Sequence, residues 1–219
     1  ETFVYKRGEK MTVNNCPYRL GDAVLYKPFR DNGKQGDIGE KCHLKNYPNS
    51  LASEYLRNTK LSEDYQTLFD IVKERSTTIT LPESDELLIH LRLGDVFYNS
   101  EYTVDELLEK SRLYKGNINY VKPYSYYENI LDKIKNINIK KIYLIGGYHM
   151  ESKQTKSEEY VAKIKLFFEK HNYKVITRIN HDPDEDFIFM SNASYFVQSG
   201  GNFSKLMGKM VTMNQKTVL

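Results

Sequence analysis

Residues 86–95 read Glu-Leu-Leu-Ile-His-Leu-Arg-Leu-Gly-Asp, and this stretch decides which fold we expect. Its apolar run, Leu87–Ile89, is typical of a strand that is buried on both faces of a parallel sheet. Directly after the run come His90, Arg92 and Asp95. In open parallel sheets, ligands bind beyond the carboxyl ends of the strands. The stretch therefore predicts both a buried strand and a ligand site at its end.

The chain beyond this stretch alternates between predicted strands and predicted helices. Short apolar runs predict strands at residues 141–145, 173–177 and 195–198. Helices are predicted after the capping box at 103–106, after Pro123, around 160–168, at 185–191 and from Asn202 onward. This alternation predicts an α/β fold, with a Rossmann-like parallel sheet and helices on both faces.

The N-terminal third differs in character from the rest of the chain. Residues 30–47 are rich in glycine and polar residues, which predicts a surface loop. A helix is predicted at 62–74, and turn residues follow at 77–84. We therefore expect a short, abbreviated N-terminal lobe at residues 1–84 and a Rossmann-like lobe at residues 85–219.

The composition argues against several classes of function. The net charge of +3 is too small to indicate nucleic-acid binding. No apolar run in the sequence approaches the length of a membrane span. The two cysteines, Cys16 and Cys42, do not form a Cys-x-x-Cys pair, so we expect free thiols rather than a zinc site. Free thiols favour the cytoplasm, and the lumen of the ER or Golgi is the alternative.

The fourth predicted strand runs into Gln-Ser-Gly-Gly-Asn-Phe-Ser at residues 198–204. This order predicts a strand, a glycine turn and a helix with Asn202 as its N-cap. The backbone N–H groups at such a helix start, together with the helix dipole, bind anions, and Ser199 and Ser204 add hydroxyl groups. The alternative is a tight turn into an ordinary capped helix. The turn lacks the lysine of a P-loop and the Gly-x-Gly-x-x-Gly spacing of a dinucleotide fold.

Arg92 and the pair Gly200-Gly201 are the two halves of one predicted site. An arginine keeps its charge and can hold a phosphate with two parallel hydrogen bonds. For Arg92 alone, an ion pair with Asp95 that closes a turn is the alternative. Because the halves follow two strands of one predicted sheet, we expect them to face each other. They would then hold a diphosphate from opposite sides and stabilise a nucleoside diphosphate leaving group, without needing a metal.

An acidic segment, residues 180–186, follows the third predicted strand. We expect Asp182 or Asp184 to accept hydrogen bonds from a purine edge or a ribose. One alternative is metal binding by this Asp-x-Asp pair, as in metal-dependent sugar transferases. The other is a charge cluster that stabilises the start of the helix from Glu185.

Two further candidates lie elsewhere in the chain. Asp22 ends the sequence Arg-Leu-Gly-Asp, and its carboxylate is a candidate base toward an acceptor hydroxyl if it faces the cleft. A turn closed by an aspartate cap is the alternative. Tyr148, at the end of the second predicted strand, is a candidate for stacking on a base or a sugar, with a flexible turn as the alternative.

His90–Asp95 resembles the His-x-Arg-(Arg)-Gly-Asp motif of the α1,2-, α1,6- and protein O-fucosyltransferase superfamily. Residues 186–204 resemble its last motif, in which a helix, a strand and a serine/phenylalanine turn meet the donor. The resemblance covers roughly residues 86–211. It implies a GT-B-type enzyme with Rossmann-like lobes that uses GDP-fucose, inverts the anomeric carbon and needs neither metal nor cofactor. Its partners would be a GDP-sugar and a glycan or other hydroxyl acceptor.

The resemblance also implies roles for single residues. Arg92 would hold the β-phosphate and assist its departure, with Asp95 in the same motif, and His90 would contact guanine or phosphate. Asp182 or Asp184 would be the acidic guanine contact. The turn at the donor phosphates would comprise Ser199, Gly200, Gly201, Asn202, Phe203 and Ser204.

The sequence departs from the family pattern at two places. Leu93 stands where the α1,2 and α1,6 enzymes have a second arginine, although protein O-fucosyltransferases also have an aliphatic residue there. Gly200-Gly201 replaces the usual Ser-Thr or Ser-Ser. Other inverting transferases, including heptosyl-like ones, are therefore alternatives. A catalytically silent domain that binds nucleotide or glycan is another, as is a metal-dependent transferase that uses Asp182 and Asp184.

Overall fold

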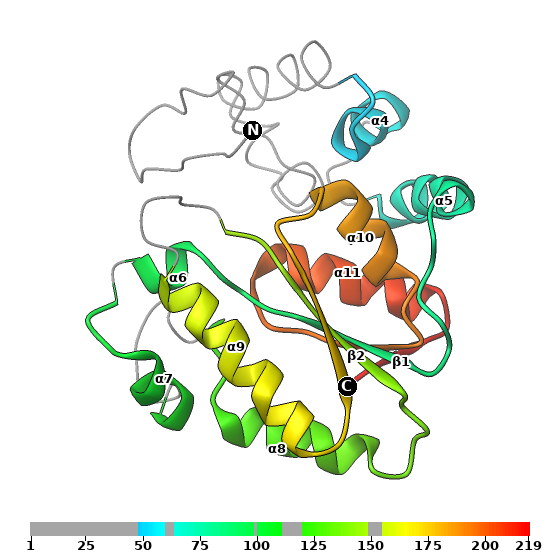
Figure 1. Ribbon diagram of the computed structural model, residues 1–219. Coiled ribbons are helices and arrows are strands. Elements are labelled where there is room, and N and C mark those ends of the chain that lie inside the picture. Colours follow the sequence, from blue (N-terminus) through cyan, green and yellow to red (C-terminus); the bar gives the residue numbers. More distant parts are fainter. Residues whose placement is uncertain (1–47, 60–63, 99, 111–119, 149–154) are drawn as a thin grey trace.

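The computed structural model describes residues 48–59, 64–98, 100–110, 120–148 and 155–219 (Figure 1). Its centre is one five-stranded sheet in the order β3-β2-β1-β4-β5, and every strand pair in it is parallel. The strands are β1 (Glu86–His90), β2 (Lys141–Gly146), β3 (Lys174–Ile179), β4 (Tyr195–Val197) and β5 (Thr217–Val218). The predicted α/β class with a parallel sheet is confirmed.

The strand order places a reversal between β1 and β4. The chain moves outward from β1 to β2 and β3, and then returns to the other side of β1 with β4 and β5. Ile89 of β1 pairs with Val197 of β4, so the carboxyl ends of these two strands lie side by side. Open α/β sheets bind ligands at such a switch point, because the loops leave the two strands in opposite directions and open a crevice between them.

Helices cover both faces of the sheet (Figure 1). One face carries α7 (Val104–Lys110), α8 (Tyr124–Ile134) and α9 (Thr155–Lys170), with the short α6 (Asp95–Tyr98) beside them. The opposite face carries α4 (Leu51–Asn58), α5 (Tyr65–Arg75), α10 (Pro183–Ser191) and α11 (Gly201–Met213). A 3-10 turn, η1 (Ser76–Thr78), follows α5.

Each face has its own hydrophobic core, and β1 contributes to both. Leu87 and Ile89 pack in the core beneath α7, α8 and α9, whereas Leu88 packs in the core beneath α10 and α11. All five residues of β1 are buried. This is the environment that the continuous apolar run predicts for a central parallel strand.

The capping box at Thr103 is confirmed. Glu106 N donates to Thr103 Oγ1 at 3.2 Å, and Thr103 N donates to Glu106 Oε2 at 2.7 Å, so each side chain satisfies the backbone of the other. The predicted N-cap at Asn202 is wrong. Gly200 holds the N-cap position, and α11 begins at Gly201, because the two glycines adopt positive φ angles of +147° and +77° and turn the chain early.

The described part of the N-terminal third packs on the sheet domain. The helix predicted at 62–74 is α5, at Tyr65–Arg75, and α4 precedes it. Both helices share one hydrophobic core with α10 and α11. Leu51 N of α4 donates to Asp184 Oδ2 of α10 at 2.8 Å. The division into lobes at residue 84 stays a prediction, since residues 1–47, which include both cysteines, lie outside the described residues.

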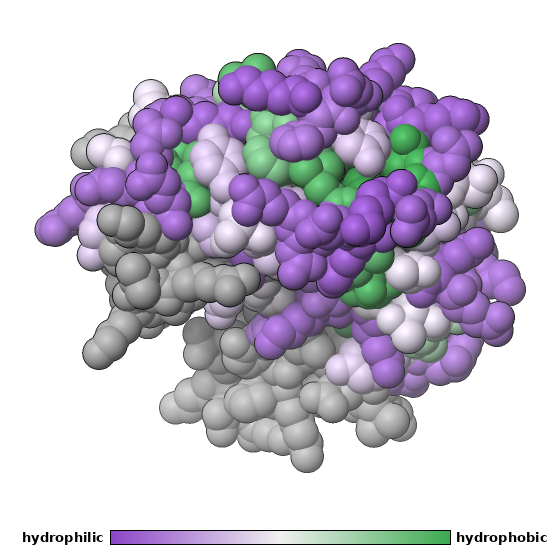
Figure 2. All heavy atoms as spheres, turned by 90° about the horizontal axis from the view of Figure 1, so that it is seen from below, coloured by the Kyte–Doolittle hydropathy of each residue, from purple (hydrophilic) through white to green (hydrophobic). Residues whose placement is uncertain are grey.

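The surface is that of an ordinary solvated domain on the face shown in Figure 2. Hydrophobic residues form small patches there that are interrupted by hydrophilic side chains. Single exposed apolar residues such as Leu166, which is 51% exposed, are normal for a folded protein. Within the described ranges, no helix is long and apolar enough to cross a bilayer.

Candidate functional site

The carboxyl end of β1 is held close to β2, and this positions the motif beyond it. Leu91 N donates to Ile145 O at 2.7 Å, so the hydrogen-bond ladder continues past the end of β1. Gly146 permits this approach, because a Cβ at that position would lie 2.8 Å from Leu91 O. Farther along, Gly94 N donates to Ser157 Oγ of α9 at 3.1 Å. The segment that carries Arg92 is thus anchored on both sides of the arginine.

His90 joins the end of β1 to the turn after β4. Its Nδ1 lies 2.8 Å from Ser199 Oγ, within hydrogen-bond distance. Its ring meets Phe203 edge-on, with ring centroids 5.8 Å apart. The two stretches that the sequence singles out therefore lie against each other at one edge of the sheet, as their positions after two parallel strands suggest.

The turn between β4 and α11 presents its backbone to this edge. Ser199 N donates to Ser204 Oγ at 3.1 Å, and both serines are buried. Among the described residues, no side chain caps α11, and the first amides of a helix have no backbone partner within the helix. Amides at a helix start, added to the positive end of its dipole, favour an anion.

Arg92 lies beside the turn. A Cβ added to Gly201 would be 4.0 Å from Arg92 Nε, so the guanidinium passes next to the glycine backbone. Gly201 itself has φ +77°, a conformation that suits glycine. A side chain here would strain the backbone, and its Cβ would be in van der Waals contact with the arginine. The Arg92 cation and the first amides of α11 therefore meet at the switch point.

The burial of His90 determines its charge. Desolvation, with the nearby Arg92 charge as a second cause, lowers the pKa of His90 to about 3. The imidazole is therefore neutral at physiological pH, with one ring nitrogen as a donor and the other as an acceptor. His90 contributes a directed hydrogen bond but no charge, and Arg92 supplies the positive charge.

The acidic segment is engaged in holding α10. Asp182 Oδ1 accepts from Asp184 N at 2.9 Å and from Glu185 N at 3.0 Å, which makes Asp182 the N-cap. Asp184 Oδ2 accepts from Leu51 N, and burial raises the pKa of Asp184. The two bonds to Asp182 agree with the helix-start interpretation, whereas the bond from Leu51 to Asp184 joins α10 to α4. The described residues hold no group of three or more His, Cys, Asp or Glu side chains placed to bind a metal ion. Nucleotide contact by Asp182 or Asp184 stays a prediction.

Substitutions at Asp182 separate capping from ligand contact. We expect Asp182→Ala to lower the free energy of unfolding by about 1 kcal/mol, because α10 loses its cap. Asp182→Ser keeps a capping oxygen and should restore that stability. If Asp182 also contacts the nucleotide, both variants bind GDP at least tenfold more weakly, since both lack the carboxylate. Calorimetric binding and urea unfolding measure the two effects. Wild-type GDP affinity in Asp182→Ser would show that Asp182 is a cap alone.

For four other predicted site residues, the structure gives a position but no contact that bears on ligand binding, or it does not describe the residue. Asp22 lies outside the described residues. Asp95 is the first residue of α6. Asn202 lies in the first turn of α11 rather than at its cap. Tyr148 is partly buried, and its backbone N–H donates to Asn180 Oδ1 at 2.8 Å. The functional roles of all four residues stay predictions.

The sequence does not predict that Tyr120 and Tyr126 contact the turn between β4 and α11. Tyr126 donates its hydroxyl to Gln198 O at 2.6 Å, and the ring of Tyr120 lies against Gly200. The contact joins residues 72 apart in sequence, and no local pattern marks it. The apolar stripe of α8 predicts that Tyr127 is buried in the core. It predicts no role for the adjacent Tyr126.

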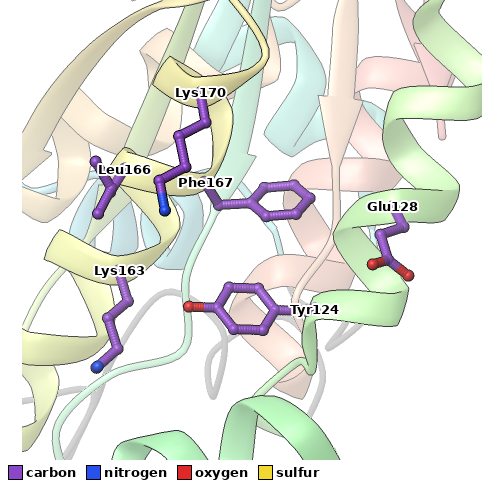
Figure 3. A pocket seen from close by; sticks show the side chains of 6 residues that line it. All are labelled: Tyr124, Glu128, Lys163, Leu166, Phe167 and Lys170. Atoms are coloured by element: carbon purple, nitrogen blue, oxygen red, sulfur yellow. The ribbon is translucent and has the colours of Figure 1, made fainter.

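A separate hollow of about 440 Å³ lies between α8 and α9 (Figure 3). The rings of Tyr124 and Phe167 stack there with centroids 5.5 Å apart. Lys163 on its rim pairs with Asp105 at 2.8 Å. The lining residues are Tyr124, Glu128, Lys163, Leu166, Phe167 and Lys170. All of them belong to the two helices, so this hollow is distinct from the site at β1 and β4.

The fold and the site together define a class of protein: a Rossmann-like α/β domain with a candidate anion site at its switch point. No protein-family model matches the chain, and no curated protein is significantly similar to it in sequence.

Solved structures of protein O-fucosyltransferase 1 (POFUT1) are similar in fold. For POFUT1 in complex with GDP, the identity is 14% and the TM-score 0.38, over 65% of this chain and 43% of that one. For the GDP-fucose complex, the identity is 13% and the TM-score 0.41, and the match covers 83% of this chain and 64% of that chain. For the apo form, the identity is 12% and the TM-score 0.43, and the match covers 76% of this chain and 57% of that chain. The chain thus spans less than two thirds of each of these proteins.

Proposed function

We propose that this chain carries the donor site of an inverting, metal-independent glycosyltransferase, which moves fucose from GDP-fucose to an acceptor hydroxyl. The observation behind this proposal is the contact between His90 and Ser199. Through it, the Arg92 segment and the start of α11 lie at one switch point. A diphosphate fits this combination, because it offers anionic oxygens on both sides.

The chemistry follows from the placement of charge. When the bond between the anomeric carbon and the β-phosphate oxygen breaks, negative charge develops on the leaving diphosphate. In the proposed site, this charge would develop beside the Arg92 guanidinium and the first amides of α11, which would then stabilise the transition state more than the substrate. The acceptor oxygen attacks the opposite face of the sugar, which inverts the anomeric carbon. Asp22 is the proposed base for the acceptor proton.

The choice of guanine and fucose rests on the motif. His90–Asp95 matches the fucosyltransferase pattern, with Leu93 at the position where protein O-fucosyltransferases are also aliphatic. Metal independence likewise rests on the resemblance. Asp182 and Asp184 each use one carboxylate oxygen for backbone hydrogen bonds, which ties their side chains to the starts of α10 and α4.

A nucleotide panel tests the donor site. We expect GDP at about 100 times its Kd to stabilise the protein by about 2.7 kcal/mol. For a chain of this size that corresponds to a rise in Tm of roughly 5–10 °C. UDP and ADP should raise Tm less, and EDTA should leave the GDP effect unchanged. Thermal unfolding with each nucleotide, with and without EDTA, measures this.

Each other outcome has a defined meaning. No response to any of the three nucleotides contradicts the donor site. An effect that EDTA removes and manganese restores favours the metal-dependent alternative. GDP binding without release of fucose from GDP-fucose, with or without an acceptor, favours a silent binding domain.

A further inference from the structure

One peptide unit leads from β4 into the glycine turn, and side chains from both faces of the sheet hold it. From α8 on one face, the Tyr126 hydroxyl donates to Gln198 O at 2.6 Å. From α11 on the other face, Ser204 Oγ accepts from Ser199 N at 3.1 Å. The carbonyl and the amide of the 198–199 peptide are therefore both fixed, and with them the orientation of its plane.

The two glycines that follow this peptide, Gly200 and Gly201, have little intrinsic preference for one conformation, so contacts from other residues must order them. Gly200 and Gly201 are in succession and both have positive φ. Glycine has the widest choice of backbone conformations, so a glycine pair loses the most entropy when it is ordered. A turn that is already ordered before the ligand arrives avoids that loss during binding. Tyr120 adds to this order, because a Cβ on Gly200 would lie only 2.7 Å from its ring.

Tyr126 is itself firmly placed. Its ring meets Tyr127 edge-on with centroids 5.5 Å apart, and Lys122 Nζ lies 5.3 Å from its ring centroid. Desolvation raises the pKa of Tyr126 to about 12. The hydroxyl therefore keeps its proton throughout the physiological range and remains a hydrogen-bond donor to Gln198.

We propose that Tyr126 is a positioning residue of the diphosphate site. Its hydrogen bond to Gln198 holds the Gly200-Gly201 turn in the conformation in which the amides converge on the phosphates. Tyr126 acts through the backbone and does not touch the ligand. The proposal rests on the proposed function for its ligand, but the ordering of the turn is a property of the protein alone.

The test is Tyr126→Phe, which removes the hydroxyl and keeps the ring. We expect the Kd for GDP to rise about five- to tenfold, the effect of losing one hydrogen bond. In the protein without nucleotide, amide hydrogen exchange at Gly200 and Gly201 should become faster, while exchange along α9 stays unchanged. Tyr124→Phe is the matched control, because this ring stacks on Phe167 and lies away from the turn. It should match wild type in both measurements.

The two measurements separate the two proposals. If wild type fails to bind GDP, the donor site is wrong, and exchange at the glycine amides still decides whether Tyr126 orders the turn. If wild type binds GDP, then equal Kd and equal exchange in Tyr126→Phe overturn the positioning role. A lower Tm with unchanged Kd overturns it as well, because the hydroxyl would then be structural only.

Discussion

Arg92→Ala lowers the rate of sugar transfer by about 10²–10³-fold, the loss expected when a fixed group that stabilises developing charge is removed. The guanidinium lies beside Gly201 at the switch point, next to where the leaving diphosphate would sit. Removing it takes away the positive charge that Arg92 places beside the first amides of α11. Release of GDP from GDP-fucose, measured with and without an acceptor, gives the rate.

Two controls make the Arg92 result specific. Arg92→Lys keeps the charge but loses the planar pair of donors, so its rate should lie between those of wild type and Arg92→Ala. Arg57→Ala removes a cation from the end of α4, where Arg57 Nη1 donates to Pro48 O, and should leave the rate unchanged. A rate for Arg92→Ala within a few-fold of wild type, at unchanged Tm, would contradict the assignment of the site.

The second large effect is a loss of stability on acidification that originates at His90. The pKa of His90 falls from 6.5 to about 3 on folding. Below pH 6.5 the unfolded chain binds a proton that the native protein excludes, so native stability decreases as the pH falls from 6.5 toward 3. The slope is about 1.4 kcal/mol per pH unit, or about 2 kcal/mol by pH 5. Above pH 6.5 the contribution of His90 is fully present.

Comparison with His90→Asn isolates the contribution of His90 to the pH dependence of the free energy of unfolding. Asp184 and Asp186, which also have shifted pKa values, are present in both proteins and cancel in the difference. We expect the difference in free energy of unfolding, wild type minus variant, to shrink by about 2 kcal/mol between pH 7 and pH 5. Urea unfolding at several pH values measures it. Parallel curves for the two proteins would mean that native His90 takes up a proton in this range and is not held neutral.

Features that depend on neighbouring residues were predictable from the sequence. The run Leu87–Ile89 predicted β1, and the Thr103–Glu106 box predicted the start of α7. The helix-start interpretation of Asp182 is also local, since its hydrogen bonds reach only two and three residues ahead. Gly200-Gly201 marks the turn, but the sequence predicts the helix cap at Asn202 rather than at Gly200. The sequence does not show that two glycines with positive φ start the helix earlier.

Features that depend on distant residues were not predictable in detail. β5 was missed, because two residues are too few to show a period, and only pairing with β4 makes them a strand. Parallel strands alone suggested that His90 and the glycine turn share an edge. Their contact, across 109 residues, required β4 to lie next to β1. The hydrogen bond from Leu51 N to Asp184 Oδ2 was not predictable either, because it joins residues that are 133 positions apart in the sequence.

The sequence by itself determined the α/β class, most of the helices and strands, and the identity of Arg92 and the glycine turn as candidates. Each of these follows from periodicity or chemistry within a few residues. Only the tertiary structure decided the strand order, the neutral state of His90 and the support of the turn by Tyr126. All three depend on burial, because burial brings the side chains together and removes water from them. Burial arises only when residues that are far apart in the chain pack against each other.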